Sequence, residues 1–173
     1  PEEVKQAIQE SIPIEDVIVR YKLPHTLILE VKEREISAAL NYLNGFALID
    51  THGFIVKLAS KLENYSIPVV TGLKVVDAKV AEKPVFQGNM VHYEVLLRLI
   101  DSLKPILQEL SEINLVADKD HETNFYLYTL DGYQVFLGEC DDEKITTLQE
   151  LLMDVRKKGM GKGLLDISHN TPI

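Results

Sequence analysis

A glycine-rich segment near the end of the chain is the stretch that most resembles a phosphate-binding loop. Gly159, Gly161 and Gly163 surround Lys162. In a phosphate loop the glycines follow a strand and open a helix, because the helix N-terminus must face the phosphate. Here the pattern is a helix, then the glycines, then a strand. We therefore predict a turn and no nucleotide site.

Two other segments carry groups that could bind a metal ion or act as a nucleophile. Residues 118–122 combine carboxylates with a histidine, but they lack the glycine and distal glutamate of a calcium-binding EF-hand, and Lys119 lies among the candidate ligands. We predict a solvated loop. Cys140 is the single cysteine, which excludes an internal disulfide, and its neighbours Glu139 and Asp141 oppose formation of the thiolate.

The remaining candidate acids and bases are scattered. Asp50 and Asp131 are each followed within three residues by a glycine, so turn formation explains them before acid–base catalysis does. The sequence has no Gly-x-Ser-x-Gly and no His-Glu-x-x-His motif. The other histidines fall on turns, a helix and the tail: His25, His52, His92 and His169. We predict a protein without catalytic residues, cofactors or metal ligands.

Composition narrows the class of partner. The 173 residues are 46% hydrophobic and 26% charged, which is ordinary for a globular protein. The net charge is −9, with 27 acidic against 18 basic residues. Nucleic-acid binding depends on Lys and Arg that neutralise phosphates, so this balance argues against such a partner. No run of about 18 apolar residues is present to span a bilayer.

The stretch from residue 124 to 155 predicts a hairpin and a helix that cover each other. Residues 125–130 and 133–137 are aromatic and β-branched runs on either side of Asp131-Gly132, a pair that favours a type I′ turn. A helix over residues 143–158 follows, and its apolar side chains recur every three or four residues: Ile145, Leu148, Leu151, Leu152 and Val155.

The rest of the chain predicts more hairpins. Residues 14–33 form one around Pro24, preceded by a helix over residues 1–10, and residues 46–58 form another around Gly53. We also predict a brief helix at 36–42, an edge strand or strand start at 65–71 because of Pro68, a helix at 90–103 and strands at 113–117 and 164–168. The expected fold is α+β, an antiparallel-rich sheet built from hairpins with helices packed on it.

Several of these segments, in this order, resemble the motifs of one family. Residues 21–34 have the pattern Pro-x-x-Leu-x-Leu-x-Val-x-x-Arg, residues 48–55 read Leu-Ile-Asp-x-x-Gly-x-Ile, and residues 67–72 read Ile-Pro-x-Val-x-Gly. Residues 130–138 and 165–167 continue the series. Together they resemble the FtsQ/DivIB cell-division proteins over about residues 17–167. The chain departs from the family pattern at Tyr21–Pro24, where Trp-Pro is usual, at Glu35 and at Ser168.

The resemblance implies the extracytoplasmic part of a single-pass protein of the bacterial cell membrane, acting at the division septum, whose anchor is absent here. It implies a C-terminal part of a POTRA domain, hairpin and helix, in residues 1–34 and a β-domain in residues 35–173. It also implies a non-catalytic scaffold that binds FtsB/DivIC-like and FtsL-like partners to recruit or regulate septal peptidoglycan synthesis.

The same resemblance places the partner contact on the last strand, where the family accepts an extra strand from the FtsB-like protein. An edge strand has an unpaired row of N–H and C=O groups that another chain can complete. The expected partner-binding residues are Gly163, Leu164, Leu165, Asp166, Ile167 and Ser168, with the cations Arg156 and Lys158, and Lys157 and Lys162 beside them. An ordinary sheet edge, and cations favoured at a helix C-terminus, remain the alternative.

Two alternative functions stay open. An extracytoplasmic hydrolase acting on cell-wall polymer would need a cleft with two carboxyl groups whose pKa values are driven apart. A POTRA-containing transport or assembly component would need a full POTRA domain or repeats of it, and the sequence shows no internal repeat.

Overall fold

The computed structural model describes residues 13–88, 90–117 and 122–169. The predicted helix over residues 1–10 lies outside the described residues, as does most of the predicted loop at 118–122.

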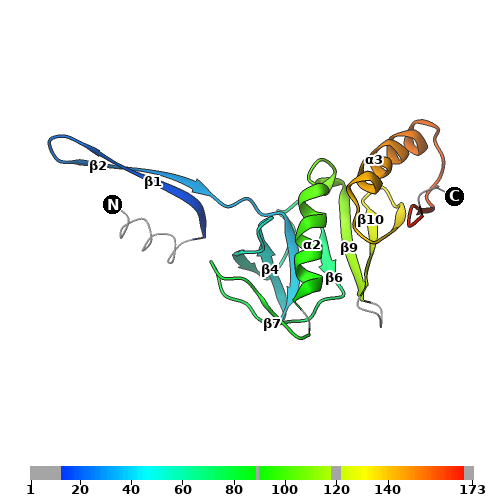
Figure 1. Ribbon diagram of the computed structural model, residues 1–173, viewed down its shortest axis with the longest axis horizontal. Helices are drawn as coiled ribbons and strands as arrows, with labels where there is room; N and C mark the ends of the chain where they lie inside the picture. The colour runs from blue at the N-terminus through cyan, green and yellow to red at the C-terminus, as the bar shows by residue number, and fades with distance from the viewer. Residues whose placement is uncertain (1–12, 89, 118–121, 170–173) are drawn as a thin grey trace.

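The first two strands form an antiparallel ribbon that extends away from the rest of the molecule (Figure 1). β1 (Ile14–Lys22) pairs with β2 (Thr26–Glu33), and Val19 lies opposite Leu29 in this register. The hairpin predicted over residues 14–33 is confirmed. The period-two alternation gives the ribbon one apolar face and one charged face.

The other strands form an eight-stranded sheet and a small separate ribbon. The sheet order is β12-β11-β10-β9-β6-β3-β4-β5. Its strands are β3 (Ala38–Tyr42), β4 (Gly45–Ile49), β5 (Ile55–Ala59), β6 (Val69–Thr71), β9 (Leu110–Ala117), β10 (Thr123–Thr129), β11 (Gln134–Gly138) and β12 (Leu164–Asp166). The small ribbon pairs β7 (Val75–Asp77) with β8 (Val85–Phe86).

The sheet is mixed but mostly antiparallel. The pairs β3–β4, β4–β5, β9–β10 and β10–β11 are antiparallel, whereas β3–β6, β6–β9 and β11–β12 are parallel. The helical elements of the described residues are α2 (Val91–Ser102), the 3₁₀ turn η1 (Leu107–Glu109) and α3 (Asp142–Lys157). The predicted α+β fold with an antiparallel-rich sheet is confirmed.

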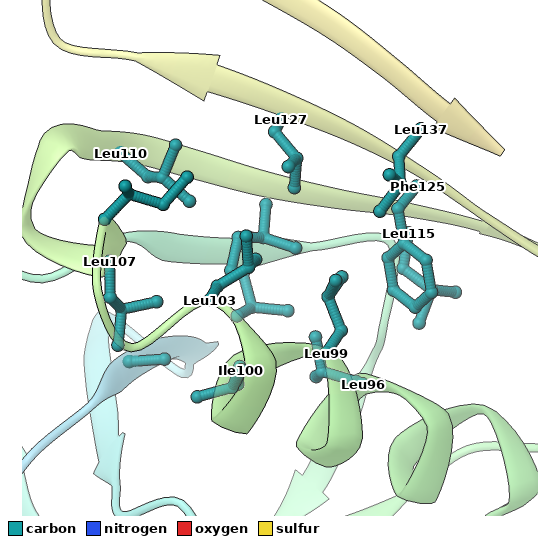
Figure 2. Packing of buried hydrophobic residues seen from close by; sticks show 14 of the residues in the cluster. Leu96, Leu99, Ile100, Leu103, Leu107, Leu110, Leu115, Phe125, Leu127 and Leu137 are labelled. Atoms are coloured by element: carbon teal, nitrogen blue, oxygen red, sulfur yellow. The ribbon is translucent and has the colours of Figure 1, made fainter. Parts of the chain in front are cut away.

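Both helices cover the same face of the sheet and share one core with it. Figure 2 shows Leu96 and Leu99 of α2, and Leu103 directly after the helix, pointing toward Leu127 of β10 and Leu137 of β11. The apolar stripe of α3 joins the same cluster through Ile145, Leu148, Leu152 and Val155. The sequence predicted this mutual cover of hairpin and helix.

α3 begins and ends where its sequence dictates. The Asp141 side chain caps the N-terminus by accepting a hydrogen bond from the Glu143 N–H at 2.9 Å. Arg156 and Lys157 lie in the last turn, where cations favour the helix dipole. The helix predicted over residues 143–158 is confirmed with a shift of one residue at each end.

The helix predicted over residues 36–42 is wrong, because this segment forms β3. Ala38, Ala39 and Leu40 are each at most 1% exposed, so both faces of the strand are covered. A strand buried on both faces is a continuous apolar run without alternation, which periodicity alone does not distinguish from a short buried helix.

Pro68 marks a strand start and not an edge. β6 begins at Val69, directly after the proline, and lies between β3 and β9 inside the sheet. Proline has no N–H to donate, but its C=O accepts a hydrogen bond from the Ala39 N–H at 3.0 Å. The alternative of an edge strand is therefore wrong.

The hairpin between β10 and β11 closes through a different turn from the predicted type I′. The Gly132 N–H donates to the Thr129 C=O at 3.1 Å, so Leu130 and Asp131 are the central residues. Of these turn residues only Gly132 has a positive φ, +96°. A tight turn followed by a left-handed glycine is the usual three-residue hairpin connection.

Candidate partner-binding site

β12 lies at one edge of the eight-stranded sheet, where it pairs in parallel with β11. The Gln134 N–H donates to the Gly163 C=O and the Ile167 N–H donates to the Phe136 C=O, each at 3.0 Å. The strand predicted at residues 164–168 is present, and its regular part ends at Asp166.

The direction of these bonds decides which backbone groups face outward. Backbone groups of successive strand residues point to opposite sides, so Gly163, Leu165 and Ile167 face β11. Leu164 and Asp166 therefore present their N–H and C=O groups to the free side, and no hydrogen bond within the described residues occupies them. An added strand would pair with these two residues.

The outward row ends at Ser168. Its N–H donates to the Asp166 Oδ1 at 3.0 Å and its hydroxyl donates to the same oxygen at 2.7 Å. These hydrogen bonds lower the pKa of the Asp166 carboxyl. The Ser168 N–H is therefore occupied by the Asp166 carboxylate, and only Leu164 and Asp166 keep outward backbone groups for an added strand.

Side chains of β12 divide between the core and the open face. Leu165 packs against the core and Ile167 is 1% exposed within it, whereas Leu164 is 62% exposed. Among the predicted binding residues, Ile167 can therefore hold β12 in place but cannot contact a partner through its side chain or its N–H. Gly163 and Leu164 are the exposed end of the strand.

Arg156 connects three elements close to β12. Its Nε and Nη2 donate to the two carboxylate oxygens of Asp131 at 2.7 and 3.2 Å, and its Nη1 donates to Glu109 Oε2 at 2.6 Å. The hydrogen bonds from Arg156 lower the pKa of Asp131 to about 2, and they raise the pKa of the guanidinium. The arginine ties the end of α3 to the β10–β11 turn and to η1.

The other predicted cations differ in whether they have an ion-pair partner. Lys158 donates to Asp154 Oδ2 at 2.6 Å on its own helix. Lys157 and Lys162 make no ion pair within the described residues. A Cβ on Gly132 would lie 2.7 Å from the Lys162 Cδ, so this lysine lies along the hairpin turn. The cations available to a partner at this edge are therefore Lys157 and Lys162, rather than Arg156 and Lys158. The sequence does not reveal this, because Asp131 is 25 residues away from Arg156 along the chain and its carboxylate meets the guanidinium only in the folded structure.

The glycine-rich segment is a helix end and a turn, as predicted. The Met160 N–H donates to the Val155 C=O at 3.0 Å and the Gly159 N–H to the Arg156 C=O at 3.1 Å, which is the Schellman arrangement. Gly159 has a φ of +63°. The segment follows a helix and leads into β12, so it does not open a helix as a phosphate-binding loop does.

The candidate nucleophile is not activated. The Cys140 thiol is half-buried, and burial, reinforced by the nearby charge of Asp142, raises its pKa. A raised pKa lowers the thiolate fraction at neutral pH. His92 contacts the Thr123 hydroxyl at 2.8 Å, which gives this histidine a structural partner.

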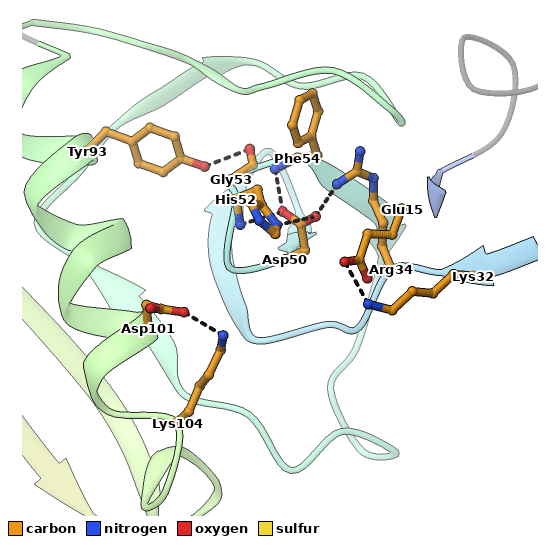
Figure 3. A network of polar contacts seen from close by, with 10 residues as sticks. All are labelled: Glu15, Lys32, Arg34, Asp50, His52, Gly53, Phe54, Tyr93, Asp101 and Lys104. Atoms are coloured by element: carbon orange, nitrogen blue, oxygen red, sulfur yellow. Dashed lines mark hydrogen bonds and ion pairs between the residues drawn. The ribbon is translucent and has the colours of Figure 1, made fainter. Parts of the chain in front are cut away.

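One hollow lined by ionisable groups lies between the base of the β1–β2 ribbon and the eight-stranded sheet, with a volume of about 420 Å³. Four of its charged side chains are paired: Lys32 donates to Glu15 at 2.8 Å, Asp50 binds Arg34, and Lys104 binds Asp101 (Figure 3). Glu35, which also lines the hollow, has no ion pair among the described residues. The Asp50 carboxylate also accepts the N–H groups of His52 and Phe54 at 3.0 and 2.8 Å. The turn role predicted for Asp50 is confirmed.

Three carboxyl groups of the described residues have pKa values shifted in the direction opposite to that of a general acid. Where the pKa of a described carboxyl group departs clearly from its ordinary value, it is lowered, as at Glu15, Asp131 and Asp166. A general acid needs a raised pKa. In the described ranges, no three His, Cys, Asp or Glu residues gather to hold a metal ion. The same ranges contain no helix with the length and hydropathy needed to cross a bilayer.

Comparisons with known proteins agree with the motif series. Residues 38–167 match the family "Cell division protein FtsQ/DivIB, C-terminal". The cell division protein DivIB of Clostridium tetani is 27% identical over 174 residues, which cover 95% of this chain and 62% of that protein. This chain thus spans less than two thirds of that relative.

A solved structure is also similar, that of the major extracytoplasmic domain of DivIB from Geobacillus stearothermophilus in its trans isomer. It is 15% identical, with a TM-score of 0.45, over 73% of this chain and 97% of that one. The family match covers β3 to β12 and the core described above. The chain belongs to the FtsQ/DivIB family of cell division proteins.

Proposed function

We propose that this chain is the extracytoplasmic part of a membrane-anchored, single-pass divisome scaffold. It binds FtsB/DivIC-like and FtsL-like proteins and so recruits or regulates septal peptidoglycan synthesis. Family membership supports the role in division. In this proposal residues 1–34 are the C-terminal part of a POTRA domain and residues 35–173 are the β-domain. The separation of the β1–β2 ribbon from the eight-stranded sheet supports this boundary between the two domains.

The observation that carries the partner proposal is the outward backbone row of β12. Leu164 and Asp166 offer four backbone groups that no hydrogen bond within the described residues occupies, at the edge of a sheet whose helix-covered face is buried. A strand from the FtsB/DivIC-like partner pairs there and extends the sheet. The exposed Leu164 side chain gives it an apolar contact.

Electrostatics favour an acidic partner segment at this edge. Lys157 and Lys162 have no carboxylate partner in the described residues and lie on either side of the turn into β12. Exposed charges of this kind increase the association rate and the specificity more than the affinity. Arg156 contributes indirectly, since it holds the α3 terminus against the β10–β11 turn.

The test compares Leu164→Pro with Leu164→Ala in binding to the FtsB/DivIC-like ectodomain. Both variants lose the exposed side chain, but only proline removes the outward N–H. The bond from Gln134 to Gly163 and the buried Ile167 are untouched, so both variants should remain folded by circular dichroism. We expect the proline variant to lose at least about tenfold more affinity than the alanine variant. Equal affinities in the two variants would place the interface elsewhere.

A further inference from the structure

The tip of the β1–β2 ribbon is the most exposed apolar part of the described molecule. Leu23 is 90% exposed and Tyr21 is 67% exposed, and they lie in and next to the turn that the Lys22–Thr26 pair closes. This turn is the end of the ribbon farthest from the eight-stranded sheet (Figure 1). Leu27 pairs with Tyr21 across the ribbon and is 44% exposed. An exposed apolar cluster at the end of a projecting element is typical of an interaction surface.

The charge of the tip differs from that of the rest of the chain. The whole chain has a net charge of −9, yet residues 17–29 contain no aspartate or glutamate and include Arg20 and Lys22. Arg20 pairs with Glu30 at 3.4 Å, whereas Lys22 has no carboxylate partner in the described residues. The tip is therefore a local cationic region.

The geometry separates the apolar and basic groups. Tyr21 and Leu27 lie opposite one another on the apolar face, while Lys22 pairs with Thr26 and projects from the other face. Leu23 lies between them at the apex. An amphipathic tyrosine, an exposed leucine and a flanking lysine suit the interface between water and hydrocarbon, where aromatic rings lie at headgroup level and lysines extend to the headgroups.

We propose that this tip, Arg20 to Leu27, docks on an anionic lipid surface, with Leu23 and Tyr21 entering the headgroup layer and Lys22 contacting anionic headgroups. The proposal goes beyond partner binding at β12, which lies at the other end of the molecule (Figure 1). One leucine and one or two cations give weak binding on their own. The contact orients a protein that is held near the membrane by other means.

A second hairpin tip provides a matched control. Leu130 is 68% exposed at the β10–β11 turn, but it lies beside Asp131 and its N–H donates to the Glu109 C=O. This tip has comparable apolar exposure, but Asp131 and Glu109 offset the charge of Arg156 there, and Lys162 lies along the same turn. Comparing the two tips tests whether an exposed leucine on a hairpin turn is by itself enough to bind vesicles.

The chain contains no tryptophan, so a single introduced tryptophan reports on one position. We would measure Leu23→Trp and Leu130→Trp fluorescence with vesicles of phosphatidylglycerol and phosphatidylcholine, and with phosphatidylcholine alone. We expect the emission at position 23 to shift to shorter wavelength on anionic vesicles only, and the emission at position 130 to stay unchanged. No shift at position 23, or an equal shift on neutral vesicles, would overturn the proposal.

Sedimentation with the same vesicles tests the residues in the otherwise unmodified chain. Leu23→Ser and Lys22→Glu should each lower the fraction bound to anionic vesicles, with a partition coefficient reduced about tenfold. Leu130→Ser should leave it unchanged, and high salt should weaken binding. If Leu23→Ser instead abolishes self-association of the chain without changing vesicle binding, the tip is a protein interface and the lipid proposal is wrong.

Discussion

Arg34 is ion-paired with Asp50, and this contact joins the end of the β1–β2 ribbon to the turn after β4 (Figure 3). The pair is largely buried, with side-chain exposures of 15% and 4%. The guanidinium also lies 4.2 Å from the centre of the Phe54 ring. Asp50 also accepts two backbone N–H groups in the β4–β5 turn. One carboxylate therefore stabilises both this turn and the junction between the β1–β2 ribbon and the eight-stranded sheet.

Removing the arginine should therefore destabilise the chain substantially. Arg34→Ala leaves a buried carboxylate without its cation, and we expect a loss of about 3 kcal/mol in the free energy of unfolding. Arg20→Ala is the matched control, because it breaks an exposed ion pair on the same ribbon and should cost less than about 0.5 kcal/mol. Urea unfolding measures both, and similar small losses would show that the buried pair does not stabilise the junction.

The Arg156 contacts should give a pH-dependent stability. The folded pKa of Asp131 is lowered to about 2, so its contribution is present above pH 4 and is lost as the pH falls toward 2. Both groups are partly exposed, so we expect Arg156→Met to lose only about 1 kcal/mol at pH 7. The difference in the free energy of unfolding between Arg156→Met and the unmodified chain, measured by urea unfolding, should shrink between pH 4 and pH 2. A loss that is the same at pH 7 and pH 2 would mean that packing of the side chain, and not its charge, is responsible.

Gly72 should tolerate no side chain. Its φ is +91°, and a Cβ would lie 1.8 Å from the Leu115 carbonyl oxygen in β9. Gly159→Ala is the control, since its φ of +63° imposes the backbone strain while nothing lies within 4 Å. We expect about 1 kcal/mol of destabilisation for Gly159→Ala and more than about 3 kcal/mol for Gly72→Ala. Equal effects would show that β9 moves freely to make room.

Leu43 offers a stabilising substitution. It is 87% exposed in the β3–β4 turn with a φ of +50°, a conformation that leucine adopts at a cost and asparagine tolerates. Leu43→Asn should raise the free energy of unfolding by about 0.5–1 kcal/mol. Leu130→Asn, at an exposed position without a positive φ, should give no such gain. Thermal unfolding of the two variants checks the difference.

Much of the fold could be predicted because its signals are local. The alternation in residues 14–33 and the three- and four-residue spacing in α3 depend on one element each, and both predictions are confirmed. β3 could not be predicted in the same way. Its neighbours in the sheet are β4 and β6, and other parts of the chain cover both of its faces, which no local spacing of residues reveals. The position of β6 inside the sheet likewise depends on its pairing with β3 and β9, which are distant from it in the sequence.

The candidate site was predictable as a segment but not in its detail. The last strand could be located from its apolar residues, whereas the outward direction of Leu164 and Asp166 depends on the register with β11. Likewise, the choice of free cations depends on contacts distant in sequence. Arg156 meets Asp131 and Glu109 only because the fold brings the end of α3 to the β10–β11 turn.

The central claim is that a partner strand pairs with β12. Hydrogen exchange of individual backbone amides, measured by NMR on the chain with and without the FtsB/DivIC-like ectodomain, tests it most directly. The Ile167 amide donates to Phe136 and should exchange slowly in both states. The Leu164 and Asp166 amides should exchange rapidly in the free chain, and binding should slow them strongly. If the partner binds while both amides continue to exchange rapidly, strand addition at β12 is contradicted.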